Sequence, residues 1–444
     1  MINIKLYNFG QMDGDGNEGL TKVTENMTKS ISFDLMSYVY EVILNRRTDS
    51  VFKMVDDNFD GKYILIISYR PDYSHTKVGV VDNILNSLPK KYIDDIKSNK
   101  CKLVFDGGQE SWCPNDDPIQ IEKLIQNKKL PFENILWLDA DPFANDKFPN
   151  IECLNLYFHS VVSHDHLKNF CDETYIKIIK NGKHFLRPKH YLMTNLVPRI
   201  QRLYLTYLCD KNNLIDKGFV SFPDITNGKA PICGPYDQKE NLLVDLNQYE
   251  GYDNNTNQWL EYFKENKKLP FQFDTIESLD DTKTKVKLSD GEDLLTHHDT
   301  TWGPYFNVVN WLNVYFDVNS ESWSNWSSEP SSPVFTEKTW RPILCGTPQL
   351  LVCEPGSLQI LRDLGFSTFD TFFDNSYDNE VDGRKRTNMI FQEIQRLCSM
   401  EKKDLHKLYY NHLDEIIHNI KYFPKFIRSR SKLLEDILEK HCGS

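Results

Sequence analysis

The chain has 444 residues, about three times the length of a typical domain, so two domains or one large domain with an appendage are expected. Hydrophobic residues make up 40% of the chain and aromatic residues 13%, which excludes an intrinsically disordered protein. The net charge of −12, from 52 basic and 64 acidic residues, argues against a protein that coats nucleic acids without regard to sequence. An acidic protein can still have a local basic groove.

The sequence shows neither a membrane span nor a secretory leader. No run comes near the roughly 18 consecutive apolar residues that a spanning helix needs, and the start, Met1 to Tyr7, reads as a strand. The ten cysteines are scattered without a C-x-x-C pair, so neither a disulfide framework nor a zinc site is indicated. We therefore expect a cytoplasmic protein, or one of the host cytoplasm if it is viral, that does not bind membranes.

Apolar runs of strand length alternate with helical patterns in the first half of the chain. The pattern predicts strands over 63–68, 102–106 and 134–139, and a helix over 120–127 that follows proline and aspartate start signals. Strands that alternate with helices predict a parallel sheet covered by helices on both faces.

The second half continues the α/β pattern after a less informative stretch. A helix is predicted over 199–213, an insertion or irregular excursion over 223–300, a buried strand over 348–353, and helices over 389–400, 403–422 and 426–440. We expect an N-terminal domain at 1–190, a C-terminal domain at 191–388, and helices at 389–444 that can cross back to the N-terminal domain.

The densest chemical signal lies in residues 333–352. Thr336 can cap a short helix whose first turn holds Glu337 and Lys338, and Gly346 then turns the chain into an apolar strand. The start of a helix favours an anion, and a lysine beside it suits a phosphate or diphosphate. A glutamate there can accept hydrogen bonds from sugar hydroxyls. The alternative is an ordinary capped helix with a surface Glu/Lys pair.

This stretch resembles the donor-binding motif of the fucosyltransferase family related to the α-1,3-fucosyltransferases, and of similar glycosyltransferases encoded by viruses. The residues that carry the resemblance are Phe335-Thr336-Glu337-Lys338, Gly346-Thr347-Pro348 and Leu350-Leu351-Val352, with weaker islands at 104–111, 199–203 and 316–322 and a tail at 356–370 that resembles bacteriophage and algal-virus members. The chain departs from the pattern at Gln109, at the Phe335–Thr336 spacing and at Pro342.

The resemblance implies an α/β protein of the glycosyltransferase B architecture, with two Rossmann-like domains facing each other across a cleft. It implies a donor of the UDP- or GDP-sugar type, bound mainly by the C-terminal domain without a metal. Glu110 would be the general base that deprotonates the acceptor hydroxyl. The implied donor-binding residues are Arg202 and Lys338 for the diphosphate, Glu337 for the ribose or sugar, and Thr336, Arg341 and Glu321.

Other residue groups could bind a metal. Asp139 and Asp141 form an Asp-x-Asp after an apolar strand, the pattern with which other glycosyltransferases hold Mn²⁺ or Mg²⁺, although a loop-capping role is favoured here. His164 and His166 have no evident third ligand, and His297 with His298 lies in a polar stretch. Glycine-rich dinucleotide, esterase and P-loop motifs are absent from the sequence.

Three functions stay open on the sequence. The first is an inverting glycosyltransferase that acts on a glycan or another hydroxyl. The second is a phage DNA glycosyltransferase that modifies a 5-hydroxymethylated pyrimidine, with which the basic and aromatic run at 183–190 is compatible. The third is a protein that keeps the transferase scaffold and binds sugars but catalyses no transfer.

Overall fold

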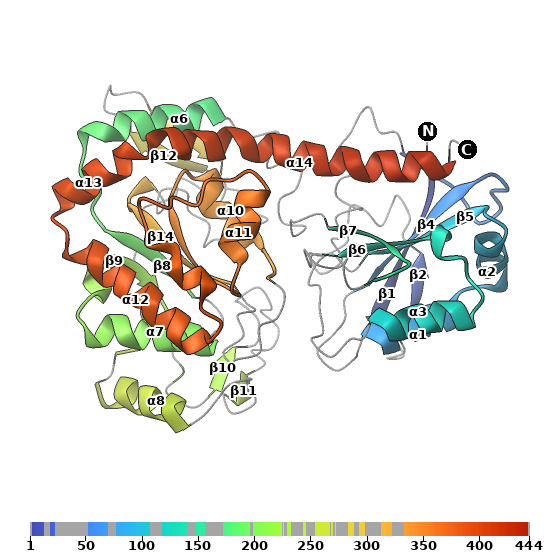
Figure 1. Ribbon diagram of the computed structural model, residues 1–444, viewed down its shortest axis with the longest axis horizontal. Helices are drawn as coiled ribbons and strands as arrows, with labels where there is room; N and C mark the ends of the chain where they lie inside the picture. Colours follow the sequence, from blue (N-terminus) through green and yellow to red (C-terminus); the bar gives the residue numbers. More distant parts are fainter. Residues whose placement is uncertain are drawn as a thin grey trace. The chain divides into compact units, whose positions relative to one another are not determined.

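The computed structural model describes residues 2–12, 18–22, 52–69, 77–106, 118–139, 148–155, 172–195, 199–223, 225, 229–231, 243–245, 254–266, 268–269, 271, 283–287, 293–297, 312–321 and 333–442. The chain divides into unit 1 (Met1–Lys168 and Lys425–Ser444) and unit 2 (Asn169–Pro424). Each unit has its own sheet of mainly parallel strands, so the chain is an α/β protein with two such sheets, as predicted (Figure 1).

Unit 1 contains a seven-stranded sheet of order β2-β1-β4-β5-β6-β7, with β3 paired to β1. Only β2 runs antiparallel to its neighbour. The elements of unit 1 are β1 (Ile2–Met12), β2 (Glu18–Lys22), β3 (Phe52–Met54), β4 (Tyr63–Tyr69), α1 (Lys77–Ser87), α2 (Lys90–Lys97), β5 (Cys101–Asp106), α3 (Pro118–Asn127), η4 (Phe132–Asn134), β6 (Ile135–Asp139) and β7 (Glu152–Asn155).

The central strands of unit 1 are buried on both faces. Every residue from Tyr63 to Ile67 in β4 is 0% exposed, although successive side chains point to opposite sides of the sheet. Continuous apolar runs are typical of parallel strands covered on both faces. The predicted strands at 63–68, 102–106 and 134–139 are confirmed as β4, β5 and β6, and α3 confirms the helix expected at 120–127.

Unit 2 contains a four-stranded parallel sheet of order β15-β14-β8-β9, and two short antiparallel pairs, β10-β11 and β12-β13. Its elements are α6 (Asp172–Asn181), η5 (Gly182–His184), β8 (Tyr191–Thr194), α7 (Ile200–Lys211), η6 (Ile215–Lys217), β9 (Gly218–Ser221), β10 (Lys229–Pro231), β11 (Leu243–Asp245), α8 (Asn254–Asn266), β12 (Lys283–Lys287), β13 (Asp293–His297), β14 (Phe316–Ser320), α10 (Glu337–Leu344), β15 (Gln349–Val352), α11 (Ser357–Asp363), η9 (Asn375–Asn379), α12 (Gly383–Ser399) and α13 (Lys402–Asn411). Helix α14 (Leu413–Cys442) begins in unit 2, and its residues from Lys425 on belong to unit 1.

The division between the units falls before the boundary expected at residue 190. Helix α6 groups with unit 2, where the hydroxyl of Tyr410 donates to the carbonyl of Ile179 at 2.8 Å. The expected irregular segment 223–300 is partly regular, because α8 packs on α7. Trp259, Leu260 and Phe263 of α8 are buried in one cluster with residues of α7, and these three apolar side chains stand in an otherwise polar sequence.

The C-terminal helices differ from the prediction in two respects. The helix expected over 403–422 is divided, because α13 ends at Asn411 and α14 begins at Leu413. We expected separate helices over 403–422 and 426–440, but α14 runs without a break through Pro424. A proline removes one backbone hydrogen bond, and the nearby residues Phe423 and Ile427 are buried. Residues 425–444 group with unit 1. No helix in the described part of the chain is long and apolar enough to cross a membrane.

Candidate functional site

The sheet of unit 2 reverses its strand order between β8 and β14. The chain passes from β8 to β9 on one side, returns to β14 on the other side of β8, and continues outward to β15. Open α/β sheets bind ligands outside the carboxyl ends of the strands at such a topological switch point. The two strands pair only at Tyr191–Phe316 and Leu192–Asp317, whereas β8–β9 and β14–β15 pair at four positions each. The β8–β14 pairing therefore stops before their carboxyl ends.

Two buried polar side chains lie beyond the last pair between β8 and β14, Leu192 with Asp317. Asn195 comes directly after β8 and is 3% exposed, and Ser320 ends β14 and is 6% exposed. Neither Nδ2 of Asn195 nor Oγ of Ser320 has a hydrogen-bond partner among the described residues. The sequence did not single out Asn195, because one asparagine after a strand forms no motif.

Helix α10 begins at this edge, and its N-terminus is held from inside the protein by Glu321. The Glu321 carboxylate is 0% exposed. It accepts hydrogen bonds from the backbone N–H groups of Thr336 and Thr339 at 3.0 and 3.2 Å, and from their hydroxyls at 2.5 Å each. Through these hydrogen bonds Glu321 positions α10. That Glu321 also contacts a nucleotide-sugar donor directly stays a prediction.

The capping role predicted for Thr336 is confirmed. Its Oγ1 accepts from the backbone N–H of Lys338 at 3.3 Å and from Lys338 Nζ at 3.2 Å. We expected free N–H groups in the first turn of α10. Those of Lys338 and Thr339 instead have partners in Thr336 and Glu321. The favourable helix N-terminus already has an anion, since the buried carboxylate occupies it.

The first turn of α7 ties β8 to the end of β14. Arg202 is 3% exposed, and its Nη2 donates to the carbonyl of Ser320 at 2.7 Å, while Gln201 Nε2 donates to the carbonyl of Glu321 at 3.3 Å. Arg202, Glu321, Thr336 and Lys338, which were predicted from separate parts of the sequence, thus lie at one edge of one sheet.

The remaining predicted residues lie apart or outside the described residues. Arg341 lies in the last turn of α10 and is partly exposed. Glu337 begins α10, but its side chain is outside the described part. Glu110 is outside the described residues, as are Asp141, His164, His166 and His298; Asp139 ends β6 and His297 ends β13 without described side chains.

A cysteine at the same edge is not poised as a nucleophile. Cys353 follows β15 and is 1% exposed. Burial, together with the negative charge of Glu321, raises the pKa of its thiol to about 12. A thiol with such a pKa stays protonated near neutral pH, and the protonated form is a weak nucleophile and a weak metal ligand. Among the described residues, no group of three His, Cys, Asp or Glu side chains could hold a metal ion.

The basic run at 183–190 is only partly a surface feature. Arg187 is buried, with its Nη1 donating to the carbonyl of Val314 at 2.5 Å and its guanidinium 4.1 Å from the ring centre of Tyr409. Lys183 and His184 are exposed, and Phe185 is 56% exposed. The exposed start of the run therefore consists of Lys183 and His184 followed by the apolar side chains of Phe185 and Leu186.

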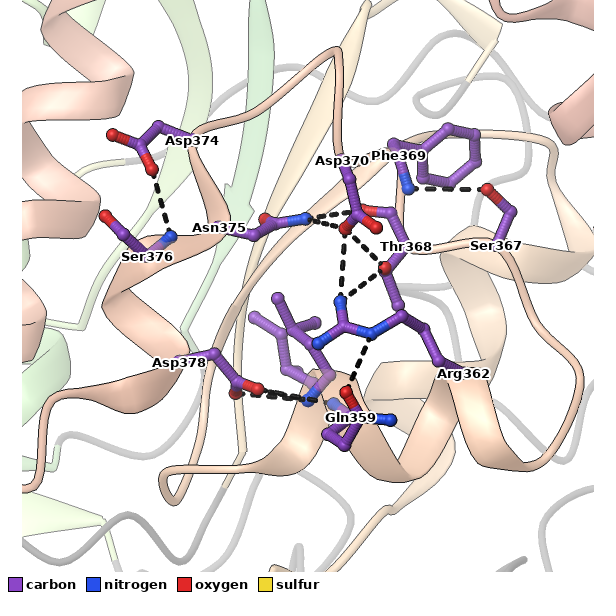
Figure 2. Close-up of polar contacts among 12 residues, drawn as sticks. Gln359, Arg362, Ser367, Thr368, Phe369, Asp370, Asp374, Asn375, Ser376 and Asp378 are labelled. Carbon is purple, nitrogen blue, oxygen red and sulfur yellow. Dashed lines mark hydrogen bonds and ion pairs between the residues drawn. The ribbon is translucent and has the colours of Figure 1, made fainter.

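A second polar cluster, beyond β15, has a structural role (Figure 2). The Asp370 carboxylate accepts from Arg362, Thr368 and Asn375 at 3.1, 2.7 and 2.7 Å. Burial alone would raise the pKa of Asp370, but these hydrogen bonds and the Arg362 charge lower it below its ordinary value. Asp378 accepts from the backbone N–H groups that begin α11. Asp370 thus braces the turn after α11, and Asp378 caps the start of this helix.

Comparison of the chain with protein-family models, with curated proteins and with solved structures gave no match. Any assignment of function therefore depends on the site itself and on the sequence motif that it contains.

Proposed function

We propose that the chain is an inverting glycosyltransferase that moves a sugar from a nucleotide diphosphate to a hydroxyl acceptor. The proposal includes the B architecture of the family it resembles. One observation carries it: the Thr336-Glu337-Lys338 segment, which resembles a donor-binding motif, begins its helix at the switch point of the unit 2 sheet. Nucleotides bind at this place in open α/β sheets.

The chemistry assigns a role to each residue of the site. The departing nucleoside diphosphate gains negative charge, which Lys338 and Arg202 would stabilise, so that a metal is not needed. Glu337 would bind the ribose or the transferred sugar. An acceptor hydroxyl must lose its proton as it attacks, and Glu110 would be the base. One displacement inverts the anomeric carbon.

The test is release of nucleoside diphosphate from a panel of UDP- and GDP-sugars, with glycan acceptors and with DNA that contains hydroxymethylcytosine. We expect Lys338→Ala to lower kcat/KM about 10- to 100-fold, because one charge-stabilising donor is lost. Lys403→Ala, at an exposed position of α13, is the control and should leave kcat/KM unchanged. Glu110→Gln should abolish transfer but spare donor binding.

Two results would contradict these roles. If Glu110→Gln transfers at the normal rate, the base is another residue. If no donor of the panel is turned over but a nucleotide sugar still binds, the chain is a sugar-binding protein on a transferase scaffold.

A second candidate is a DNA glycosyltransferase, which the exposed ring of Phe185 favours. Nucleic-acid surfaces combine basic groups for phosphates with aromatic rings on which bases stack. Phe185 lies beside the exposed Lys183, and His406 Nε2 lies 2.8 Å from the Lys183 carbonyl, which fixes this segment on α13. If DNA is the acceptor, Phe185→Ala should reduce DNA-dependent release and leave DNA-independent release unchanged.

A further inference from the structure

Two unsatisfied polar atoms stand out at the switch point of unit 2. Within the described part of the chain, Nδ2 of Asn195 and Oγ of Ser320 have no hydrogen-bond partner, although both side chains are more than nine-tenths buried. Backbone groups of both residues have partners: the backbone N–H of Asn195 donates to the Ser221 carbonyl at 3.1 Å, and the Ser320 carbonyl accepts from Arg202. An unpaired buried polar group costs about 1–3 kcal/mol, so natural proteins leave few of them without a purpose.

The strand register relates the two side chains. The last paired residues of β8 and β14 are Leu192 and Asp317, and Asn195 and Ser320 lie equally far beyond them. Equal distances along two adjacent parallel strands place both residues at the same end of the sheet, beyond the last β8–β14 pair. Helix α7, which follows Asn195 in the chain, returns to Ser320 through the Arg202 hydrogen bond. Both unsatisfied groups therefore belong to the place where the fold predicts a ligand.

The chemistry of the pair restricts what the ligand group can be. The amide Nδ2 can only donate, whereas the serine hydroxyl can donate and accept. A hydroxyl group of a ligand can accept from Nδ2 and donate to Oγ, so it satisfies both atoms. A phosphate oxygen only accepts, and it prefers cationic partners.

We propose that Asn195 and Ser320 form a hydroxyl-binding subsite that positions the sugar part of the nucleotide-sugar donor. This inference rests on the proposed function and adds two residues that the sequence motif does not contain. The hydroxyl belongs either to the ribose or to the transferred sugar. The two cases differ in which ligands bind more weakly to the variants.

The experiment is calorimetric titration of the full chain with UDP, GDP, their 2′- and 3′-deoxyribose forms, and the corresponding UDP- and GDP-sugars. The variants are Asn195→Ala, Asn195→Asp and Ser320→Ala. Asn212→Ala is the control, because Asn212 is exposed and caps the opposite end of α7. We expect Asn195→Ala and Ser320→Ala to weaken binding about tenfold, the effect of one buried hydrogen bond.

A ribose contact predicts that the wild type discriminates against one deoxyribose form and that Asn195→Ala loses this discrimination. A contact with the transferred sugar predicts that the variants weaken binding of the nucleotide sugar but not of the free diphosphate. Asn195→Asp should bind at least as well as Asn195→Ala, since a hydroxyl can donate to a carboxylate. Because neither atom has a partner among the described residues, Asn195→Ala and Ser320→Ala lose no hydrogen bond there and should melt close to the wild type.

Three results would overturn the inference. Unchanged affinities in both alanine variants would show that the subsite does not exist, and the proposed function would stand. An Asn195→Asp variant that binds much more weakly than Asn195→Ala would mean that the partner is a phosphate. A wild type that binds no nucleotide or nucleotide sugar would refute this inference and the proposed function together.

Discussion

Gly346 connects α10 to β15 at a point where only glycine fits. Its φ is +66°, and a Cβ there would lie 2.3 Å from Ile179 Cδ1 and 2.9 Å from Ile420 Cδ1. Both the backbone conformation and the close packing exclude a side chain. The turn therefore fixes how the helix that carries Lys338 joins the sheet.

We predict that Gly346→Ala lowers the free energy of unfolding by about 2–4 kcal/mol, from backbone strain and overpacking together. Gly356→Ala is the matched control. Gly356 also has a positive φ of 80°, but nothing lies within 4 Å of a Cβ built on it. Gly356→Ala should lower the free energy of unfolding by only about 1 kcal/mol. Urea denaturation of both variants gives the comparison, and equal losses would mean that packing against α6 and α14 contributes nothing.

At the scale of elements, Glu321 determines whether α10 forms in its observed position. Its carboxylate joins the end of β14 to the first turn of α10 through Thr336 and Thr339. Glu321→Gln keeps the size of the side chain but removes its charge, and the amide NH2 in place of Oε2 competes with Lys338 for the Thr336 hydroxyl oxygen. We expect a loss of about 2–3 kcal/mol in unfolding free energy.

The control for this prediction is Glu265→Gln, on the exposed face of α8. Thermal and urea denaturation should show a change within about 0.5 kcal/mol for the control. If Glu321→Gln is equally stable but no longer binds a donor, then Glu321 contacts the ligand directly, as the family resemblance implies, and its structural role is minor.

Elements with a strong local pattern were predictable, and those that depend on distant partners were not. Strands β4, β5 and β6 are continuous apolar runs, and the α10 cap is signalled by Thr336 itself. Helix α8 was not predicted because few of its residues are buried and the sequence around them is polar. The partnership of Glu321 with the α10 start, and the subsite of Asn195 and Ser320, depend on strand order, which local patterns do not encode.

At the scale of the whole molecule, the two sheets are expected to respond differently to a donor. The switch point with α10 belongs to unit 2, whereas β4 to β6 belong to unit 1. A ligand that binds only the native state stabilises the part it contacts by RT ln(1 + [L]/Kd), about 2.7 kcal/mol at a concentration of 100 Kd. Local opening reactions of the contacted elements are suppressed by the same free energy.

We therefore predict that saturating nucleoside diphosphate slows amide hydrogen exchange in β8, β14 and α10 of the full chain more than in β4, β5 and β6. Exchange followed by mass spectrometry resolves these segments. Lys338→Ala should reduce the slowing at the same nucleotide concentration, whereas Lys403→Ala should keep it in full. Slowing that is strongest in β4 to β6, or equal in both sheets, would mean that the nucleotide does not bind at the unit 2 switch point, and the roles given to Lys338, Arg202 and Asn195 would have to be abandoned.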